Sequence, residues 1–144
     1  MRDFTWRLSA ATGSTVLYFD YRLADLALTG QSLHSNARSD PLMDVKRLPA
    51  YAQRYLAGAD PRHPYASPLY GDALGLPPLL IQVGSDEILR DDAVRMADKL
   101  RAAGCDVEIE IWPRMPHAWH HFARVLPEGR DAIARIGAFL QQRL

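Results

Sequence analysis

Two short segments in the second half of the chain have the hydrophobic pattern of neighbouring strands. Residues 79–83 (LLIQV) are almost continuously apolar and precede Gly84, which is typical of a strand buried on both faces of a parallel sheet. Residues 107–111 instead alternate apolar and acidic side chains. The second strand is therefore expected to bury Val107, Ile109 and Ile111 on one face and to lie near an edge of the sheet.

An amphipathic helix is predicted after each of these strands. Residues 91–103 have apolar side chains at helical spacing, and Gly104 stands where a left-handed C-terminal cap belongs. Residues 133–140 show the same spacing in a closing helix. The apolar positions are Val94, Ala97, Leu100, Ile133, Ile136, Gly137 and Leu140. The order strand, helix, strand, helix predicts an α/β fold with a parallel-dominated sheet, flanking helices and right-handed crossovers.

The N-terminal part, residues 1–24, is predicted to contain one helix and one strand. Apolar residues between positions 4 and 11 can share one side of a short helix that Gly13 ends. The β-branched and aromatic run at residues 15–21 (TVLYFDY) has the length of a strand. We therefore expect an early helix followed by a buried strand.

Residues 25–78 are predicted to connect this part to the strands of residues 79–144. The stretch 22–41 is polar and has no sustained period, so it is interpreted as a loop, although it is long for a compact domain. Asp44 can cap a helix that becomes regular near Pro49 and is closed by Gly58. A proline-rich surface connection is expected to follow over residues 60–78.

Composition narrows the class of protein and of partner. The 144 residues are 48% hydrophobic and 24% charged, which is the profile of one soluble globular domain. A formal net charge of +0 argues against a nucleic-acid surface, which needs a basic excess. No apolar run is long enough to span a bilayer. The single Cys105 cannot form an internal disulfide and is expected to be buried, so we expect a cytoplasmic protein with small-molecule partners.

The chemistry is expected in the loops that follow the two strands, because open parallel sheets bind ligands beyond the carboxyl ends of their strands. The first loop offers Asp86 and the second offers His117. A carboxylate that accepts a bond from imidazole Nδ1–H fixes the tautomer and stabilises the imidazolium formed after proton transfer. One helix and one strand separate these two residues, so both side chains can reach the same rim and act as an acid–base pair.

Less specific roles for the same residues stay open at this point. Asp86 can be a turn or cap residue, and His117 can be a loop histidine bonded to backbone. Three further carboxylates lie close to Asp86 along the chain, and negative charge at a helix N-terminus explains them better than catalysis does. These are Glu87, Asp91 and Asp92.

A resemblance favours the catalytic interpretation. The run SPLYGDALGLPPLLIQVGSDEILRDDAVRMADKLRAAGCDVEIEIWPRMPHAWHHF is similar to the C-terminal part of bacterial esterases of the hormone-sensitive-lipase group, within the α/β-hydrolases. The phrases DLALTGQSLHSNARSDPLMDV and VLYFDYRLA also resemble segments of that family. The resemblance implies that Asp86 is the acid of a catalytic triad, that His117 is its base, and that no metal or organic cofactor takes part.

The third triad member, a serine nucleophile, is not found. The family carries a Gly-x-Ser-x-Gly elbow and a His-Gly-Gly-Gly type oxyanion loop, and neither motif occurs in this sequence. Because VLYFDYRLA runs directly into DLALTGQ at Ala24 and Asp25, we expect an internal deletion, and the start at Met1 suggests that the N-terminal part is absent as well. A gene-reading artefact is an alternative origin of this junction.

Ser32 provides a partial match to the elbow, because Gly30-Gln31-Ser32-Leu33-His34 agrees with it at four positions. Three observations argue against it. His34 stands where a small residue usually lets the turn close, no clear strand precedes Gly30, and no apolar helix follows at once. The resemblance also places this segment in a non-catalytic part of the family. We therefore do not expect Ser32 to be a nucleophile.

The loop after the second strand contains other residues with chemical potential. His117 and His121 are four apart and could face one way on a helix, but no second group of ligands accompanies them, so no metal site is expected. His120 and His121 are interpreted as rim or surface residues. Trp112 and Trp119 are expected to pack, with lining of an acyl pocket as the alternative.

Taken with the resemblance, these patterns predict an incomplete α/β-hydrolase domain over residues 1–144. The expected function is carboxylic ester hydrolysis of the serine esterase or lipase type, with Asp86 orienting His117 as general base. Without an elbow, the chain alone is expected to have little or no activity. The alternative is a non-catalytic binding module that self-associates through exposed sheet surface.

Overall fold

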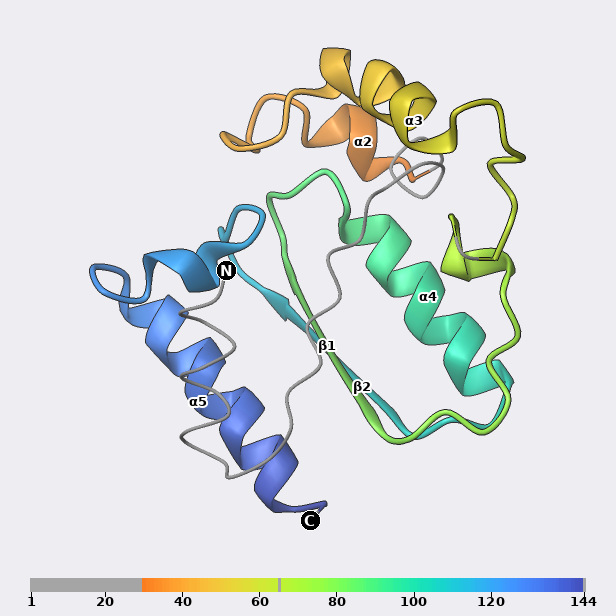
Figure 1. Cartoon of the computed structure of the whole chain (residues 1–144). Coiled ribbons are helices and arrows are strands. Elements are labelled where there is room, and N and C mark those ends of the chain that lie inside the picture. The colour runs from red at the N-terminus through yellow and green to blue at the C-terminus, as the bar shows by residue number, and fades with distance from the viewer. Residues whose placement is uncertain (1–29, 65, 144) are drawn as a thin grey trace. The chain divides into compact units, whose positions relative to one another are not determined.

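The computed structural model describes residues 30–64 and 66–143 (Figure 1). The chain divides into two compact units, of which the described parts are residues 30–117, apart from residue 65, and residues 118–143. Each unit is considered by itself. The predicted helix at residues 4–11 and the predicted strand at residues 15–21 lie outside the described residues.

The first unit contains the predicted strand–helix–strand arrangement. Strand β1 (Leu79–Gly84) pairs in parallel with strand β2 (Val107–Trp112), in a register that places Leu79 opposite Val107 and Gly84 opposite Trp112. Helix α4 (Arg90–Ala102) connects them. The parallel α/β arrangement is therefore confirmed for the described residues, and the two strands end level with each other at their carboxyl ends.

Helix α4 lies alongside the two strands (Figure 1). It contributes to a core cluster that it shares with them. Its inward side chains meet residues from both strands, because the apolar positions of the helix recur at the helical period. The buried members of this cluster are Ala73, Ala97, Leu100 and Val107, with Leu79, Ile81 and Ile109 among those packed against them. Gly104 has a φ of 81° after the helix end, as the predicted left-handed cap requires.

Burial of the strands differs from the prediction. In β1 only Val83 and Gly84 are buried and residues 79–82 are half-buried, whereas the apolar run predicts burial on both faces. In β2 Val107 is buried, but Ile111 is 47% exposed although the alternation predicts that it faces inward. A strand is buried on both faces when helices cover each face and other strands flank each edge. Within the described residues of this unit the sheet has two strands, and its core cluster is shared with α4.

The segment before the sheet contains more helix than the loop prediction allows. A short helix α2 (Ser32–Ser35) lies within the stretch interpreted as loop, which is a correction to that interpretation. A 3-10 turn η2 (Val45–Arg47) and helix α3 (Leu48–Leu56) follow. The Asp44 carboxylate accepts a hydrogen bond from Lys46 N at 3.0 Å, so the predicted cap is confirmed at the 3-10 turn that leads into α3.

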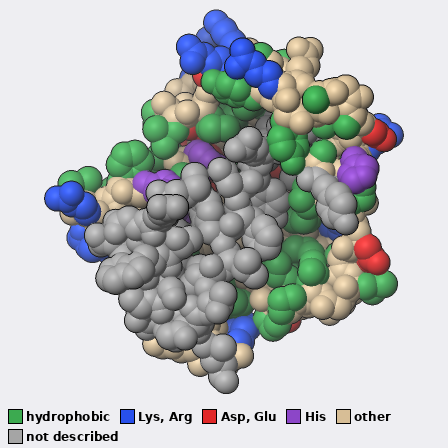
Figure 2. Space-filling view, viewed as in Figure 1, with side chains coloured by type: hydrophobic (Ala, Val, Ile, Leu, Met, Phe, Trp, Pro, Cys, Tyr) green, Lys and Arg blue, Asp and Glu red, His purple; other side chains and the backbone are tan. Residues whose placement is uncertain are grey.

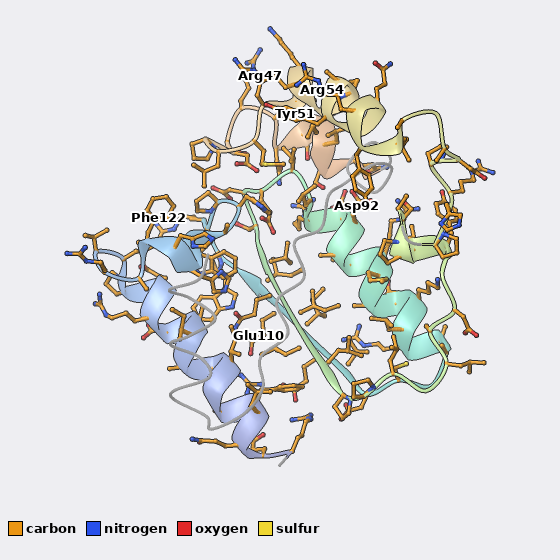
Figure 3. All side chains as sticks on the ribbon, in the orientation of Figure 1. Arg47, Tyr51, Arg54, Asp92, Glu110 and Phe122 are labelled. Carbon is orange, nitrogen blue, oxygen red and sulfur yellow. The ribbon has the colours of Figure 1, made fainter. Side chains whose placement is uncertain are left out.

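Helix α3 ends with two left-handed residues. Ala57 has a φ of 47° and Gly58 has a φ of 88°, which confirms that the helix closes at the predicted glycine and adds a strained alanine before it. One side of the segment of η2 and α3 faces solvent, and Arg47, Tyr51 and Arg54 point outward from it (Figure 3). Lysine and arginine side chains gather over this region in Figure 2. The proline-rich connection that follows contains the 3-10 turn η3 (Pro68–Tyr70).

The second unit, residues 118–143, contains the predicted closing helix. The 3-10 turn η4 (Trp119–Phe122) precedes helix α5 (Pro127–Gln141), which starts with a proline at its first position. Gly129 allows the two to approach, because a Cβ there would lie 3.0 Å from Ala123 Cα and 3.1 Å from Trp119 O. Among the described helices, none is long and apolar enough to cross a membrane.

Candidate active site

The candidate site is built where β1 and β2 end together. The backbone N–H of Ser85, one residue after β1, donates to Trp112 O at the end of β2 (2.9 Å), and Asp86 N donates to Met115 O at 3.3 Å. The loop after β1 is called the acid loop below (residues 85–89), and the loop after β2 the histidine loop (residues 113–117). These backbone bonds hold the two loops side by side at one rim of the sheet, as the parallel topology predicts.

Gly84, the last residue of β1, lies directly against the backbone of the histidine loop. A Cβ atom at this position would lie 2.0 Å from Met115 O and 2.7 Å from Met115 C, both of which are backbone atoms. Only glycine fits between the end of β1 and the histidine loop without moving the chain. The sequence indicated Gly84 as the residue that follows the strand, but not this contact.

The histidine loop is bent by two residues in the left-handed region. Arg114 has a φ of 58° and Ala118 has a φ of 54°, and they stand on either side of His117. Non-glycine residues rarely adopt this conformation, and such strain concentrates at functional sites. At the first of these residues the loop is bonded to the acid loop, because Arg114 N donates to Ser85 Oγ at 2.7 Å.

His117 is paired with Glu87. Its Nδ1 atom lies 2.8 Å from Glu87 Oε2. The other carboxylate oxygen of Glu87, Oε1, accepts a hydrogen bond from Gly84 N at 3.1 Å. The Glu87 side chain is only 6% exposed, whereas the His117 side chain is 37% exposed. In the neutral tautomer that donates Nδ1–H to the carboxylate, Nε2 keeps its lone pair and can act as a base.

Asp86 has a different place from the one predicted. Its Oδ1 accepts a hydrogen bond from Ser85 Oγ at 2.7 Å, and the same hydroxyl accepts from Arg114 N at 2.7 Å. The Asp86 carboxylate therefore contacts the Ser85 hydroxyl, and this hydroxyl in turn bonds to the backbone of the histidine loop at Arg114. The structure brings His117 together with Glu87.

The interpretation of Glu87 as a helix N-terminal charge is thus wrong. Helix α4 begins only at Arg90, and the buried Glu87 carboxylate is bonded to His117 and to Gly84 N. Sequence reasoning could not choose between two adjacent carboxylates, because the backbone conformation of the acid loop decides which of them turns inward. The only signal in the sequence was that Glu87 follows Asp86 directly in the right loop.

Ser32 is built into the interior. It is 0% exposed, its Oγ donates to Ile88 O at 2.7 Å, and it accepts a hydrogen bond from Asp91 N at 3.0 Å. A hydroxyl that is buried and bonded in both directions cannot attack a substrate from solvent. The rejection of Ser32 as a nucleophile is supported by this geometry.

Replacing Ser32 by alanine is expected to lower the free energy of unfolding by about 2 kcal/mol, because it leaves the buried Ile88 O and Asp91 N without their partner. Urea denaturation measures the change. Ser39→Ala serves as the control, because the Ser39 hydroxyl is exposed and water can replace its bonds to Asn36 O and Asp86 O, so the expected loss is about 0.5 kcal/mol. Equal stability of the two variants would contradict the structural role of Ser32.

His120, Trp119 and Trp112 each have a defined contact in the structure. His120 lies against Trp119 with ring centroids 4.0 Å apart, and Trp119 is 1% exposed. The Trp112 indole donates to Glu110 Oε2 at 3.2 Å. Across residues 30–64 and 66–143, no group of three or more His, Cys, Asp or Glu side chains could hold a metal ion.

Comparison with known proteins places this geometry in a family. A family model described as alpha/beta hydrolase fold (Abhydrolase_3) matches residues 25–121. An acetyl-hydrolase of Streptomyces hygroscopicus is 53% identical over 118 residues, and an esterase of Acinetobacter venetianus is 39% identical over 116 residues. The crystal structure of an esterase from the bacterial hormone-sensitive lipase family superposes with a TM-score of 0.79 at 49% identity.

The matches cover most of this chain and less than half of each relative. They include 82% of the chain and 40% of the acetyl-hydrolase, 80% of the chain and 38% of the esterase, and 84% of the chain and 42% of the crystal structure. The chain therefore spans about two fifths of the length of these relatives.

Proposed function

Because the chain belongs to the α/β-hydrolase fold family, we propose that it carries the acid–base half of a serine-dependent carboxylic ester hydrolase. The observation that carries the proposal is the Glu87–His117 pair at the rim of the parallel strands. The relatives named as an acetyl-hydrolase and as esterases support ester substrates, with a small acyl group such as acetyl as the first choice.

In the proposed reaction His117 moves the protons and Glu87 orients it. His117 Nε2 takes the proton of a serine hydroxyl as the oxygen attacks the ester carbonyl, and the imidazolium is stabilised by the Glu87 carboxylate at Nδ1. The proton then passes to the leaving alcohol as the acyl-enzyme forms. A water oxygen then attacks the acyl carbonyl while His117 takes its proton. The acyl–serine bond breaks as His117 returns this proton to the serine oxygen, which releases the acid and restores the serine.

The nucleophilic serine is not assigned to any described residue. The 144 residues contain no Gly-x-Ser-x-Gly motif, and Ser32 is buried and bonded. We therefore propose that the chain alone has little or no esterase activity, because removal of a nucleophile costs about a million-fold in turnover.

A chimera tests the proposal. Residues 30–143 replace the matching region of the Streptomyces hygroscopicus acetyl-hydrolase, which keeps that protein's own remaining segments. We expect the chimera to hydrolyse p-nitrophenyl acetate and the chain alone to be neither active nor labelled by an activated fluorophosphonate. Stoichiometric phosphonylation of a serine in the chain alone would contradict its inactivity. A folded chimera without turnover would favour the non-catalytic alternative.

A further inference from the structure

The backbone of the acid loop is bonded to a segment that lies far away from it in the sequence. Residues 32–40, called the support segment here, donate side-chain hydrogen bonds to four consecutive carbonyls of the acid loop. Asn36 Nδ2 donates to Ser85 O at 2.8 Å and to Glu87 O at 2.9 Å. Ser39 Oγ donates to Asp86 O at 3.3 Å, and Ser32 Oγ donates to Ile88 O at 2.7 Å. Each backbone carbonyl from residue 85 to residue 88 therefore accepts a side-chain hydrogen bond from the support segment.

The same segment also accepts bonds from the acid loop. Asp40 Oδ2 accepts from Ile88 N at 3.1 Å, while its Oδ1 accepts from Leu42 N at 3.0 Å. Asn36 and Asp40 are both buried, and buried polar networks of this kind fix one backbone conformation when all members are satisfied. Leu33 and Ile88 pack in the same core cluster, so the contact is apolar as well as polar.

We propose that Asn36 is a positioning residue for the Glu87 carboxylate. Its amide bridges the carbonyls on either side of Asp86, which sets the turn of the acid loop. With this turn Glu87 points inward to His117, and the Asp86 side chain instead accepts from Ser85 Oγ. Asn36 thus decides which of two adjacent carboxylates meets the imidazole.

The chemistry of the bridge requires an asparagine. Two carbonyl acceptors need two N–H donors from one group, and the amide supplies both. Its oxygen, Oδ1, accepts from Ser35 Oγ at 3.1 Å, so the orientation of the amide is fixed at both ends. An aspartate of the same shape would set carboxylate oxygens against two carbonyl oxygens. The positioning of Glu87 is a property of the fold, and its catalytic meaning rests on the proposed function.

The test uses the full 144-residue chain and two NMR signals. The exchange rate of the Gly84 amide reports the Glu87 side chain, because that N–H bonds to Glu87 Oε1. The tautomer of His117, read from long-range proton–nitrogen correlations, reports the bond from Nδ1. We expect Asn36→Asp and Asn36→Ala to accelerate Gly84 exchange roughly tenfold or more and to abolish the Nδ1–H preference of His117.

Two comparisons separate positioning from general stability. Leu100→Ala removes buried apolar contact in α4 and should lower stability while leaving the His117 tautomer unchanged. Asn36→Ser keeps a small polar side chain and one donor, so it remains informative where the other variants unfold. Any folded Asn36 variant that keeps both wild-type signals would overturn the role of Asn36.

The same two NMR signals distinguish a failure of the proposed acid–base pair from a failure of the proposed role of Asn36. A wild-type chain in which His117 shows no Nδ1–H preference would contradict the acid–base pair. The Gly84 amide would still decide whether Asn36 positions Glu87, because this signal does not depend on the imidazole.

Discussion

Replacing Glu87 by glutamine in the active chimera is expected to lower kcat by about 10³- to 10⁴-fold, because the carboxylate that holds His117 in its tautomer is lost. KM for p-nitrophenyl acetate should change little, since Glu87 is buried behind the histidine. Steady-state kinetics with the chimera and its variants measure both constants.

Asp86→Asn is the matched control, because it changes the neighbouring carboxylate by the same kind of charge loss. An amide at position 86 keeps an oxygen that can accept from Ser85 Oγ, so we expect less than about a tenfold loss in kcat. The assignment of Glu87 would fail if Asp86→Asn proved the more damaging of the two. The kinetics therefore decide between the acid that the sequence predicted and the one that the structure places next to His117.

The second large effect is expected for Gly84→Ala. The added Cβ would meet two backbone atoms of Met115 well inside contact distance, and neither belongs to a flexible side chain. The end of β1 and the histidine loop must then separate, which we expect to cost about 3 kcal/mol or more in the free energy of unfolding. The bonds from Asp86 N to Met115 O and from His117 to Glu87 should weaken together.

Gly137→Ala provides the control for this variant. It lies inside α5, and no atom of residues 30–64 or 66–143 stands within 4 Å of the position that an added Cβ would take, so alanine should stabilise the helix by roughly 0.5–1 kcal/mol. Urea denaturation compares the two variants directly. A Gly84→Ala chain as stable as the wild type would show that the two loops are not packed as closely as described.

The predictability of the fold followed from local periodicity. The apolar run before Gly84, the helical spacing up to Gly104 and the alternation from Val107 were enough to predict two parallel strands joined by a helix. The burial of these strands was predicted less well. Ile111 is exposed because inward facing depends on what lies beside the sheet, which the sequence of one strand does not contain.

The structure agrees with the sequence on which two loops meet and differs from it on which carboxylate contacts His117. Parallel strands end at the same edge, so a carboxylate after β1 and a histidine after β2 had to come close, and the Glu87–His117 bond confirms that geometric expectation. The identity of the carboxylate depended on a turn fixed by Asn36, about fifty residues earlier. No local pattern around residue 86 carries that information.

By itself the sequence determined the order of the described strands and helices and the rim at which the acid loop and the histidine loop meet. Both depend on periodicity and on the geometry of parallel sheets. Only the tertiary structure decided that Glu87 meets His117, that Asp86 accepts from Ser85, and that Ser32 is an interior hydroxyl. The physical reason is that hydrogen bonds from distant residues set the backbone torsions of a loop. A shift of the turn by one position along the chain changes which side chain faces inward.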